Sequence, residues 1–200
     1  MNKIIKNAAI LTAITVIAGL ALGVVYEITK EPIASAKAKA KQEACQEVLP
    51  EADTFEIQTV DQAAAEQTVA DLGVNARVDE VYTAMSGSET AGYVVTTTDS
   101  DGYGGDIQIS VGILSDGTVN GISILEIGET AGLGMKATEP EFYGQYAGKQ
   151  AEKFYVAKDG GEGEPIDALS GATITSRAVT GAVNTALGYY QNALGGSGNE

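Results

Sequence analysis

The sequence has no histidine, no tryptophan and a single cysteine, Cys45. Without histidine there is no imidazole for a catalytic base or a metal ligand, and Ser170 has no evident partner that would make it a nucleophile. One cysteine excludes an intrachain disulfide and a cysteine-ligated zinc or iron–sulfur site. We therefore predict no catalytic residues and no bound metal, and we interpret Cys45 as an ordinary thiol.

Positive charge is also scarce, because 12 lysines and arginines stand against 27 aspartates and glutamates, a net charge of −15. The phosphates of a nucleic acid would be repelled by such a chain, so we exclude nucleic-acid binding. The acidic surface is typical of a well-solvated domain. Two of the few cations, Lys3 and Lys6, precede every acidic residue.

Those lysines are followed by 19 residues without a charge, from Ala8 to Tyr26. A helix of that length can cross a bilayer, and the positive-inside rule places the N-terminus in the cytoplasm and the rest of the chain outside. The alternative is a cleaved signal peptide, but no clear Ala-x-Ala site follows the apolar run. We favour a retained anchor in the cytoplasmic (inner) membrane that spans it once.

The remaining chain divides by composition. We assign residues 1–28 to the cytoplasmic N-terminus and anchor, 29–50 to a helical stalk, 51–194 to one domain and 195–200 to a flexible tail. The stalk has a possible break at Pro32, and Pro50 ends it. In the domain, residues 54–60, 80–85, 92–98 and 153–157 have strand character, residues 61–72 form a helix or loop, and residues 139–146 form a short helix with Phe142 and Tyr146 inward.

A β-hairpin is the strongest secondary-structure signal in the domain. Apolar residues alternate through residues 107–114, which predicts a strand with one buried face, and Ser115-Asp116-Gly117 forms a turn into a return strand at 119–127. Near the C-terminus, Val179, Val183 and Leu187 follow helical spacing in a helix that begins near Thr173 and ends near Leu194.

Two glycine-rich loops flank this hairpin. Gly102-Tyr103-Gly104-Gly105 is a turn where backbone could approach a flat group, although a structural turn is the simpler interpretation. The loop from Glu126 to Lys136 contains Gly132 and Gly134, which could pack closely on a ligand, while Glu129, Thr130 and Lys136 could supply hydrogen bonds. This second loop does not match G-x-G-x-x-G, and its lysine is not in the frame of a phosphate-binding loop, so we exclude Rossmann and P-loop folds.

The segment Ser170-Gly171-Ala172-Thr173-Ile174-Thr175 lies immediately before the last helix. Free N–H groups at a helix start favour an anion such as phosphate, and Arg177 could reach the same anion from the next turn. The simpler alternative is that Thr173 is an ordinary N-cap. The residues alone also leave Thr173 and Thr175 open as reactive hydroxyls.

The string Asp-x-x-Ser-Gly-Ala-Thr resembles the motif at which a flavin transferase attaches FMN, through its phosphate, to a threonine. Together with the lysine-flanked anchor, the two glycine loops and the hairpin, it makes the chain similar over essentially its full length to the G subunit of Rnf electron-transport complexes. The C subunit of the sodium-pumping NADH:quinone reductase represents a related family. Ala131 stands where the family usually has proline.

The resemblance implies an α+β fold, namely an N-terminal transmembrane helix followed by a compact extracytoplasmic FMN-binding domain with an antiparallel sheet. It implies covalent FMN on Thr173, added by a flavin transferase, with Thr175 as the competing acceptor. It also implies an electron relay among the other proteins of a complex that transfers electrons between ferredoxin and NAD⁺ and moves Na⁺ or H⁺. The residues expected around the cofactor are Ser170, Gly171, Ala172, Thr175, Glu129, Thr130, Gly132, Leu133, Gly134, Lys136 and Tyr103.

Two alternatives remain from the sequence. The chain could be the covalent-FMN subunit of a different, quinone-reductase-like membrane reductase, since the acceptor motif would be the same. It could also be a non-redox binding protein anchored in the cell envelope, in which Thr173 only caps a helix.

Overall fold

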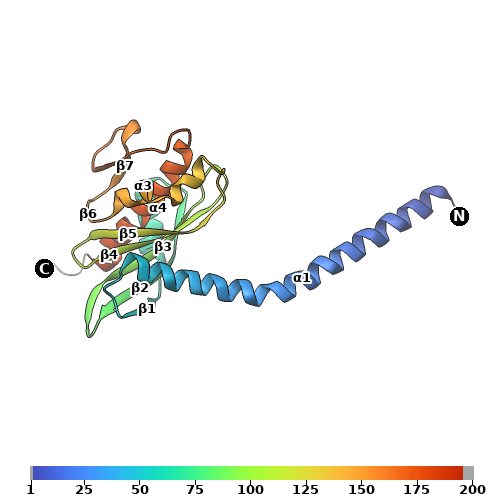
Figure 1. Cartoon of the computed structure of the whole chain (residues 1–200), viewed down its shortest axis with the longest axis horizontal. Helices are drawn as coiled ribbons and strands as arrows, with labels where there is room; N and C mark the ends of the chain where they lie inside the picture. The colour runs from blue at the N-terminus through green and yellow to red at the C-terminus, as the bar shows by residue number, and fades with distance from the viewer. Residues whose placement is uncertain (1, 196–200) are drawn as a thin grey trace. The chain divides into compact units, whose positions relative to one another are not determined.

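The computed structural model describes residues 2–195, so the predicted flexible tail lies outside the described residues except for Gly195. The chain forms two compact units, residues 1–40 and residues 41–200 (Figure 1). The first unit consists of the helix α1 (Lys3–Val48) up to residue 40. In the described part of the chain, α1 is the one helix long and apolar enough to cross a membrane, with a mean hydropathy of 2.5 in its most apolar window.

Helix α1 continues through Pro32, so the predicted break there is wrong. Proline removes only the hydrogen bond that its own nitrogen would have donated to the carbonyl of Ile28, and the turns on either side keep theirs. Polar side chains in the helix are satisfied locally, because the Thr12 hydroxyl donates to the carbonyl of Ala8 at 3.0 Å and that of Thr29 donates to Val25 at 2.9 Å. Each of these hydroxyl groups therefore has a partner within the helix.

The globular unit is built on a six-stranded antiparallel sheet with the strands in sequence order. This meander confirms the predicted α+β fold with an antiparallel sheet. A separate pair of short parallel strands lies later in the chain, and a two-residue edge strand closes the main sheet. The strands are β1 (Thr54–Gln58), β2 (Ala76–Ser86), β3 (Glu89–Asp99), β4 (Ile107–Leu114), β5 (Thr118–Ile127), β6 (Lys149–Gln150), β7 (Phe154–Val156) and β8 (Glu164–Ile166).

Two longer helices and several short ones accompany the sheet. Helix α2 (Gln62–Leu72) begins at the cap Asp61, whose carboxylate accepts the N–H groups of Ala63 and Ala64, and ends at Gly73 in the left-handed conformation. Helix α4 (Thr173–Tyr189) continues into the wider turn η4 (Tyr190–Leu194). The short helices are η1 (Gly134–Thr138), α3 (Pro140–Tyr143), η2 (Gly144–Tyr146) and η3 (Ala157–Asp159), of which α3 and η2 replace the single helix predicted at 139–146.

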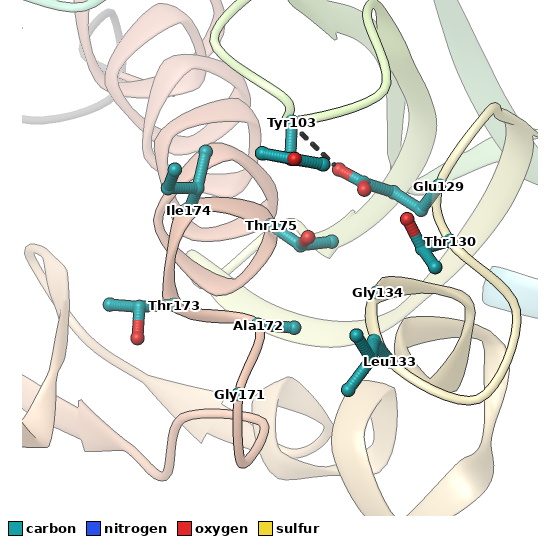
Figure 2. A pocket seen from close by; sticks show the side chains of 10 residues that line it. All are labelled: Tyr103, Glu129, Thr130, Leu133, Gly134, Gly171, Ala172, Thr173, Ile174 and Thr175. Carbon is teal, nitrogen blue, oxygen red and sulfur yellow. Dashed lines mark hydrogen bonds between the residues drawn. The ribbon is translucent and has the colours of Figure 1, made fainter.

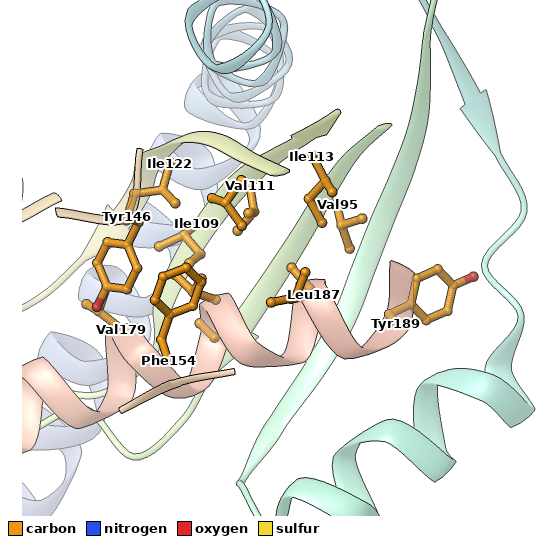
Figure 3. Close-up of a cluster of buried hydrophobic side chains, with 14 of the residues drawn as sticks. Val95, Ile109, Val111, Ile113, Ile122, Tyr146, Phe154, Val179, Leu187 and Tyr189 are labelled. Atoms are coloured by element: carbon orange, nitrogen blue, oxygen red, sulfur yellow. The ribbon is translucent and has the colours of Figure 1, made fainter. Parts of the chain in front are cut away.

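Helix α4 packs along one face of the sheet and forms the main core (Figure 3). Val179, Val183 and Leu187 of the helix are fully buried with the alternating isoleucines of β4, as the periodicity predicts. Polar contacts fix the helix on the sheet, since the Thr97 hydroxyl donates to the carbonyl of Ala182 at 3.0 Å. The predicted inward positions of Phe142 and Tyr146 are confirmed, and both side chains are buried.

The opposite face of β4 is also buried, so the prediction of one buried face is wrong. Residues at the end of α1 cover this face of the sheet and form a second apolar cluster with residues of β2 and β3, which includes Cys45, Val48 and Val94. The contact is so close that a Cβ atom at Gly112 would lie 2.6 Å from the carbonyl oxygen of Val48. Residues 41–50, assigned by composition to a stalk, are therefore part of the globular unit. Burial there raises the pKa of the Cys45 thiol to about 11.

One carboxylate is buried between the sheet and α4. Asp99, at the end of β3, is 2% exposed and accepts the backbone N–H of Asp101 at 2.8 Å. It packs so closely against α4 that a Cβ atom at Gly181 would lie 2.5 Å from its Oδ2 atom. Burial, assisted by the negative charges of Asp101 and Asp106, raises the pKa of Asp99 to about 6.

We predict that Asp99→Asn stabilises the protein at neutral pH. Because the folded state raises this pKa from 3.8 to about 6, folding favours the protonated form, and the wild type should lose stability as the pH rises from about 4 to 6. The variant should be more stable by about 2 to 3 kcal/mol at pH 7.5 and equal to wild type below pH 4. Urea unfolding of both proteins from pH 3.5 to 8 measures this, and parallel pH profiles would contradict it.

Candidate functional site

A pocket of about 530 Å³ lies at the N-terminal end of α4 (Figure 2). The first turn of the helix faces two loops across it, the glycine-rich turn after β3 and the loop after β5. Its volume is in the range of small-molecule and cofactor sites. The lining residues are Tyr103, Glu129, Thr130, Leu133, Gly134, Gly171, Ala172, Thr173, Ile174 and Thr175.

Nine of the twelve residues predicted from the sequence line this pocket, although they come from three separate segments. Ser170, Gly132 and Lys136 do not line it. Gly132 and Ser170 are exposed in turns, and Gly132 has a positive φ of 77° that turns the chain back. Lys136 lies in η1, where its side chain is exposed, so a direct role of these three residues has no geometric support.

The two loops are joined to each other by Glu129. This carboxylate is 9% exposed, and its Oε1 atom accepts the backbone N–H of Tyr103 at 2.9 Å. The loops also touch through backbone alone, because a Cβ atom at Gly104 would lie 2.1 Å from the carbonyl oxygen of Gly128. We infer that Glu129 chiefly shapes the pocket, while its sequence pattern had suggested a hydrogen bond to a ligand.

Gly134 closes the base of the pocket. A Cβ atom there would lie 2.7 Å from the hydroxyl oxygen of Thr175 and 2.8 Å from Oε2 of Glu129. Only glycine allows the loop to approach the first turn of α4 this closely. The loop is held in this position by two N–H groups, those of Leu133 and Met135, which both donate to the carbonyl of Thr130 at 3.1 Å.

The start of α4 differs from the predicted N-cap. Ala172 occupies the cap position without a side-chain hydrogen bond, and Thr173 is the first helical residue, so the N-cap interpretation of Thr173 is wrong. Ser176 stabilises this end of the helix instead, because its hydroxyl donates to the carbonyl of Ala172 at 2.9 Å and accepts the N–H of Leu169 at 3.0 Å. The Thr173 side chain therefore does not cap the helix. The N–H groups of the first helical turn have no partner within the helix.

The two candidate hydroxyls differ in accessibility. Thr173 is half-buried at the pocket edge, whereas Thr175 is 1% exposed beneath the loop that carries Gly134. The Thr173 hydroxyl also has a partner that the sequence did not reveal, since the Nζ atom of Lys158 donates a hydrogen bond to it. Lys158 lies in η3, after β7, and no sequence motif links it to Thr173.

Arg177 does not reach the pocket, contrary to the prediction from its position one turn into the helix. Its Nε donates to Oδ2 of Asp159 at 2.7 Å and its Nη2 to Oδ1 at 2.5 Å. This bidentate pair lowers the pKa of Asp159 and engages the guanidinium with a carboxylate. The pocket lining in the described chain contains no lysine or arginine.

The mouth of the pocket is apolar. Four large apolar side chains are exposed in the described part of the globular unit, and three of them line the pocket: Tyr103 at 72%, Leu133 at 45% and Ile174 at 47%. Helical periodicity had identified Ile174 only as a helix residue. Clustered exposed apolar side chains mark binding surfaces, and these three would suit a flat aromatic group.

Comparison with known families accounts for most of the chain. The FMN-binding domain family matches residues 102–188, a range that contains every residue lining the pocket. The RnfG N-terminal region family matches residues 1–48.

Individual relatives agree with these families. The chain is 36% identical to the G subunit of the Na⁺-translocating ferredoxin:NAD⁺ oxidoreductase complex of Acetobacterium woodii, with 94% of this chain and 92% of that protein covered. It is 33% identical to the G subunit of the proton-translocating ferredoxin:NAD⁺ oxidoreductase complex of Clostridium ljungdahlii, with 98% and 96% covered. Among solved structures, it shares its fold with the C subunit of the Na⁺-translocating NADH-quinone reductase of Parabacteroides distasonis, at a TM-score of 0.54, 18% identity and coverage of 79% and 94%.

We predict that Gly134→Ala destabilises the protein by about 1 to 3 kcal/mol, because the added methyl group would overlap the Thr175 hydroxyl and the Glu129 carboxylate. Gly144→Ala is the matched control, since that site has a helical φ of −65° and open space around it. The control should stay within about 0.5 kcal/mol of wild type. Urea unfolding measures both, and equal stabilities of the two variants would be inconsistent with the close contact at the base of the pocket.

Proposed function

The chain belongs to the RnfG family, the G subunits of Rnf-type ion-translocating oxidoreductase complexes, and from this premise we propose that it is the membrane-anchored FMN protein of such a complex. In this role it relays electrons within a ferredoxin:NAD⁺ oxidoreductase whose electron transfer drives Na⁺ or H⁺ across the membrane. Its partners are the other membrane and peripheral subunits. The chain carries no catalytic residue of its own and acts as part of an oxidoreductase.

The observation that carries this proposal is the pocket at the start of α4, which lies wholly within the matched FMN-binding segment. When bound, FMN supplies one- and two-electron redox chemistry, so the protein has to hold and tune it and need not provide an acid–base pair. The described residues fit that task. Tyr103, Leu133 and Ile174 offer apolar contact for a flat ring, and the Thr130 hydroxyl faces the same space.

We further propose that FMN is attached covalently to Thr173 by a flavin transferase that uses a flavin dinucleotide as the donor. The Thr173 hydroxyl displaces a nucleoside monophosphate from the FMN phosphorus, so that a phosphodiester bond forms as the pyrophosphate bond breaks and the hydroxyl proton is released. The support is geometric as well as motif-based. The Thr173 hydroxyl is half-buried at the pocket edge and takes no part in capping α4, whereas Thr175 is almost fully buried. The unpaired N–H groups of the first helical turn are placed where they can bind the phosphate oxygens.

The membrane arrangement is also part of the proposal. Helix α1 would be a retained single-pass anchor in the cytoplasmic membrane, with Lys3 and Lys6 inside and the globular unit on the extracytoplasmic side. Retention is supported by the RnfG N-terminal match, which spans residues 1–48 and so includes both the apolar run and the residues that pack on the globular unit.

The two alternative functions have less support. A quinone-reductase-like role draws on the shared fold, but at 18% identity that likeness extends to the fold alone. Copurification from native membranes would separate the two complexes by the partner proteins recovered. The non-redox binding protein required Thr173 to be a helix cap, and Ala172 holds that position.

We predict that Thr173→Val abolishes covalent FMN and that Thr175→Val retains it. Valine has nearly the shape of threonine but lacks the hydroxyl, so each variant removes one acceptor with little change in packing. The full chain is coexpressed with a flavin transferase, and mass spectrometry of the tryptic peptides locates the added group. Covalent FMN in the Thr173→Val protein would overturn the assignment.

We predict that alkaline phosphatase fused after residue 200 is active and that green fluorescent protein fused at the same point is dark. Alkaline phosphatase needs disulfides, which form outside the cytoplasm. Deletion of residues 3–26 should reverse both results and serves as the control. A fluorescent full-length fusion with inactive phosphatase would place the globular unit in the cytoplasm instead.

A further inference from the structure

We propose that the Lys158 ammonium pairs with the phosphate attached to Thr173, and that the contacts of η3 with α4 hold this lysine beside the Thr173 hydroxyl. The inference rests on the proposed FMN attachment and adds a residue to it that neither the motif nor the pocket lining contains. The starting observation is the hydrogen bond from Nζ of Lys158 to Oγ1 of Thr173.

Consecutive residues of η3 (Ala157–Asp159) contact consecutive turns of α4. Lys158 reaches Thr173 in the first turn, and Asp159 binds Arg177 one turn later through both carboxylate oxygens. Because residues four apart lie on the same side of a helix, the two contacts hold η3 along one face of α4. The lysine stem is thus fixed at its base.

The strand that leads into η3 is also anchored to α4. The side-chain amide of Asn184 binds the backbone of Phe154 at both ends, accepting its N–H at 2.8 Å and donating to its carbonyl at 2.9 Å. Phe154 is fully buried, and its ring meets that of Tyr146 at 5.2 Å between centroids. The position of Lys158 therefore depends on the core, although the side chain itself is exposed.

Cations are scarce in the globular unit, so the position of Lys158 beside Thr173 is notable. Residues 41–200 contain 7 lysines and arginines but 25 aspartates and glutamates. An attached phosphodiester adds another negative charge to a surface that already repels anions. Arg177 is engaged by Asp159, and Lys136 does not line the pocket, so Lys158 is the cation in contact with the acceptor.

The chemistry of the ester explains how the contact would change. Once Thr173 Oγ1 is bonded to phosphorus, it becomes a weak acceptor, and the negative charge lies on the two non-bridging oxygens. Those oxygens lie two bonds beyond Oγ1, on the far side of the phosphorus atom. A lysine ammonium on a flexible stem can follow them, and it would then form a charge-assisted hydrogen bond beside the helix N–H groups.

The test uses the flavinylated full chain in detergent and ³¹P NMR, since the phosphodiester is the one phosphorus expected on the protein. The variants are Lys158→Gln, Lys158→Arg and, as a matched control, Lys153→Gln, which makes the same charge change at an exposed lysine that precedes β7. We expect Lys158→Gln to shift the resonance toward its value in the denatured protein. Lys158→Arg should keep most of the wild-type shift, and Lys153→Gln should keep all of it.

Salt provides a second readout that a purely structural role would not affect. Raising the salt from about 0.05 M to 1 M should move the wild-type resonance toward that of Lys158→Gln, because the pair is solvent-exposed and screened, while the variant should respond little. Should Lys158→Gln fail to fold, as judged by thermal unfolding, the wild-type salt dependence and the arginine variant decide the question.

The outcomes separate this inference from the one on which it rests. If the wild type carries no phosphodiester resonance, the proposed FMN attachment fails. If the resonance is present but identical in wild type, Lys158→Gln and Lys153→Gln, with the same salt response, only the role of Lys158 is overturned. Loss of flavinylation in folded Lys158→Gln, restored in Lys158→Arg, would support the requirement for a cation at this position.

Discussion

The packing of α4 against the sheet is the constraint on which the rest of the globular unit depends. The helix buries nearly all of its length in the main core with β3 and β4 (Figure 3). Its first turn lines the pocket together with the two glycine-rich loops (Figure 2). The core therefore fixes the position of the first turn of α4, and the two loops complete the pocket around it. Thr173 sits at the end of a buried helix, and the loops that face it are held by N–H groups that donate to the Glu129 carboxylate and to the Thr130 carbonyl.

The pocket exists because backbone approaches backbone and side chains at points where a Cβ atom would not fit. Gly104 lies against Gly128, and Gly134 lies against Thr175 and Glu129. These contacts bring three segments, distant in the sequence, around one space. The apolar side chains of Tyr103, Leu133 and Ile174 are exposed at the mouth of this pocket, where they can contact a planar cofactor.

Sequence patterns predicted the secondary-structure elements and loops that are determined by nearby residues. Alternation identified the β4–β5 hairpin, helical spacing identified α4, and the glycine-rich loops proved to be the other walls of the pocket. Two errors were local, the break at Pro32 and the N-cap at Thr173. The others concern contacts between distant segments. The second face of β4 is covered by Val48, which belongs to a segment with no strong pattern, and Arg177 binds Asp159, an acid in a loop without a motif. Lys158 contacts Thr173 because β7 and η3 pack along α4, and sequence periodicity does not predict that packing.

The central claim is that this chain carries FMN covalently, and in-gel fluorescence of the denatured protein tests it most directly. The full chain is coexpressed with a flavin transferase, fully denatured, separated by size and illuminated with ultraviolet light before staining. A yellow-green band at the mass of the chain is the predicted result, because only a covalent flavin survives denaturation. A dark band, in cells where the same transferase labels a known substrate, would contradict the account and leave the pocket at the start of α4 without its proposed occupant.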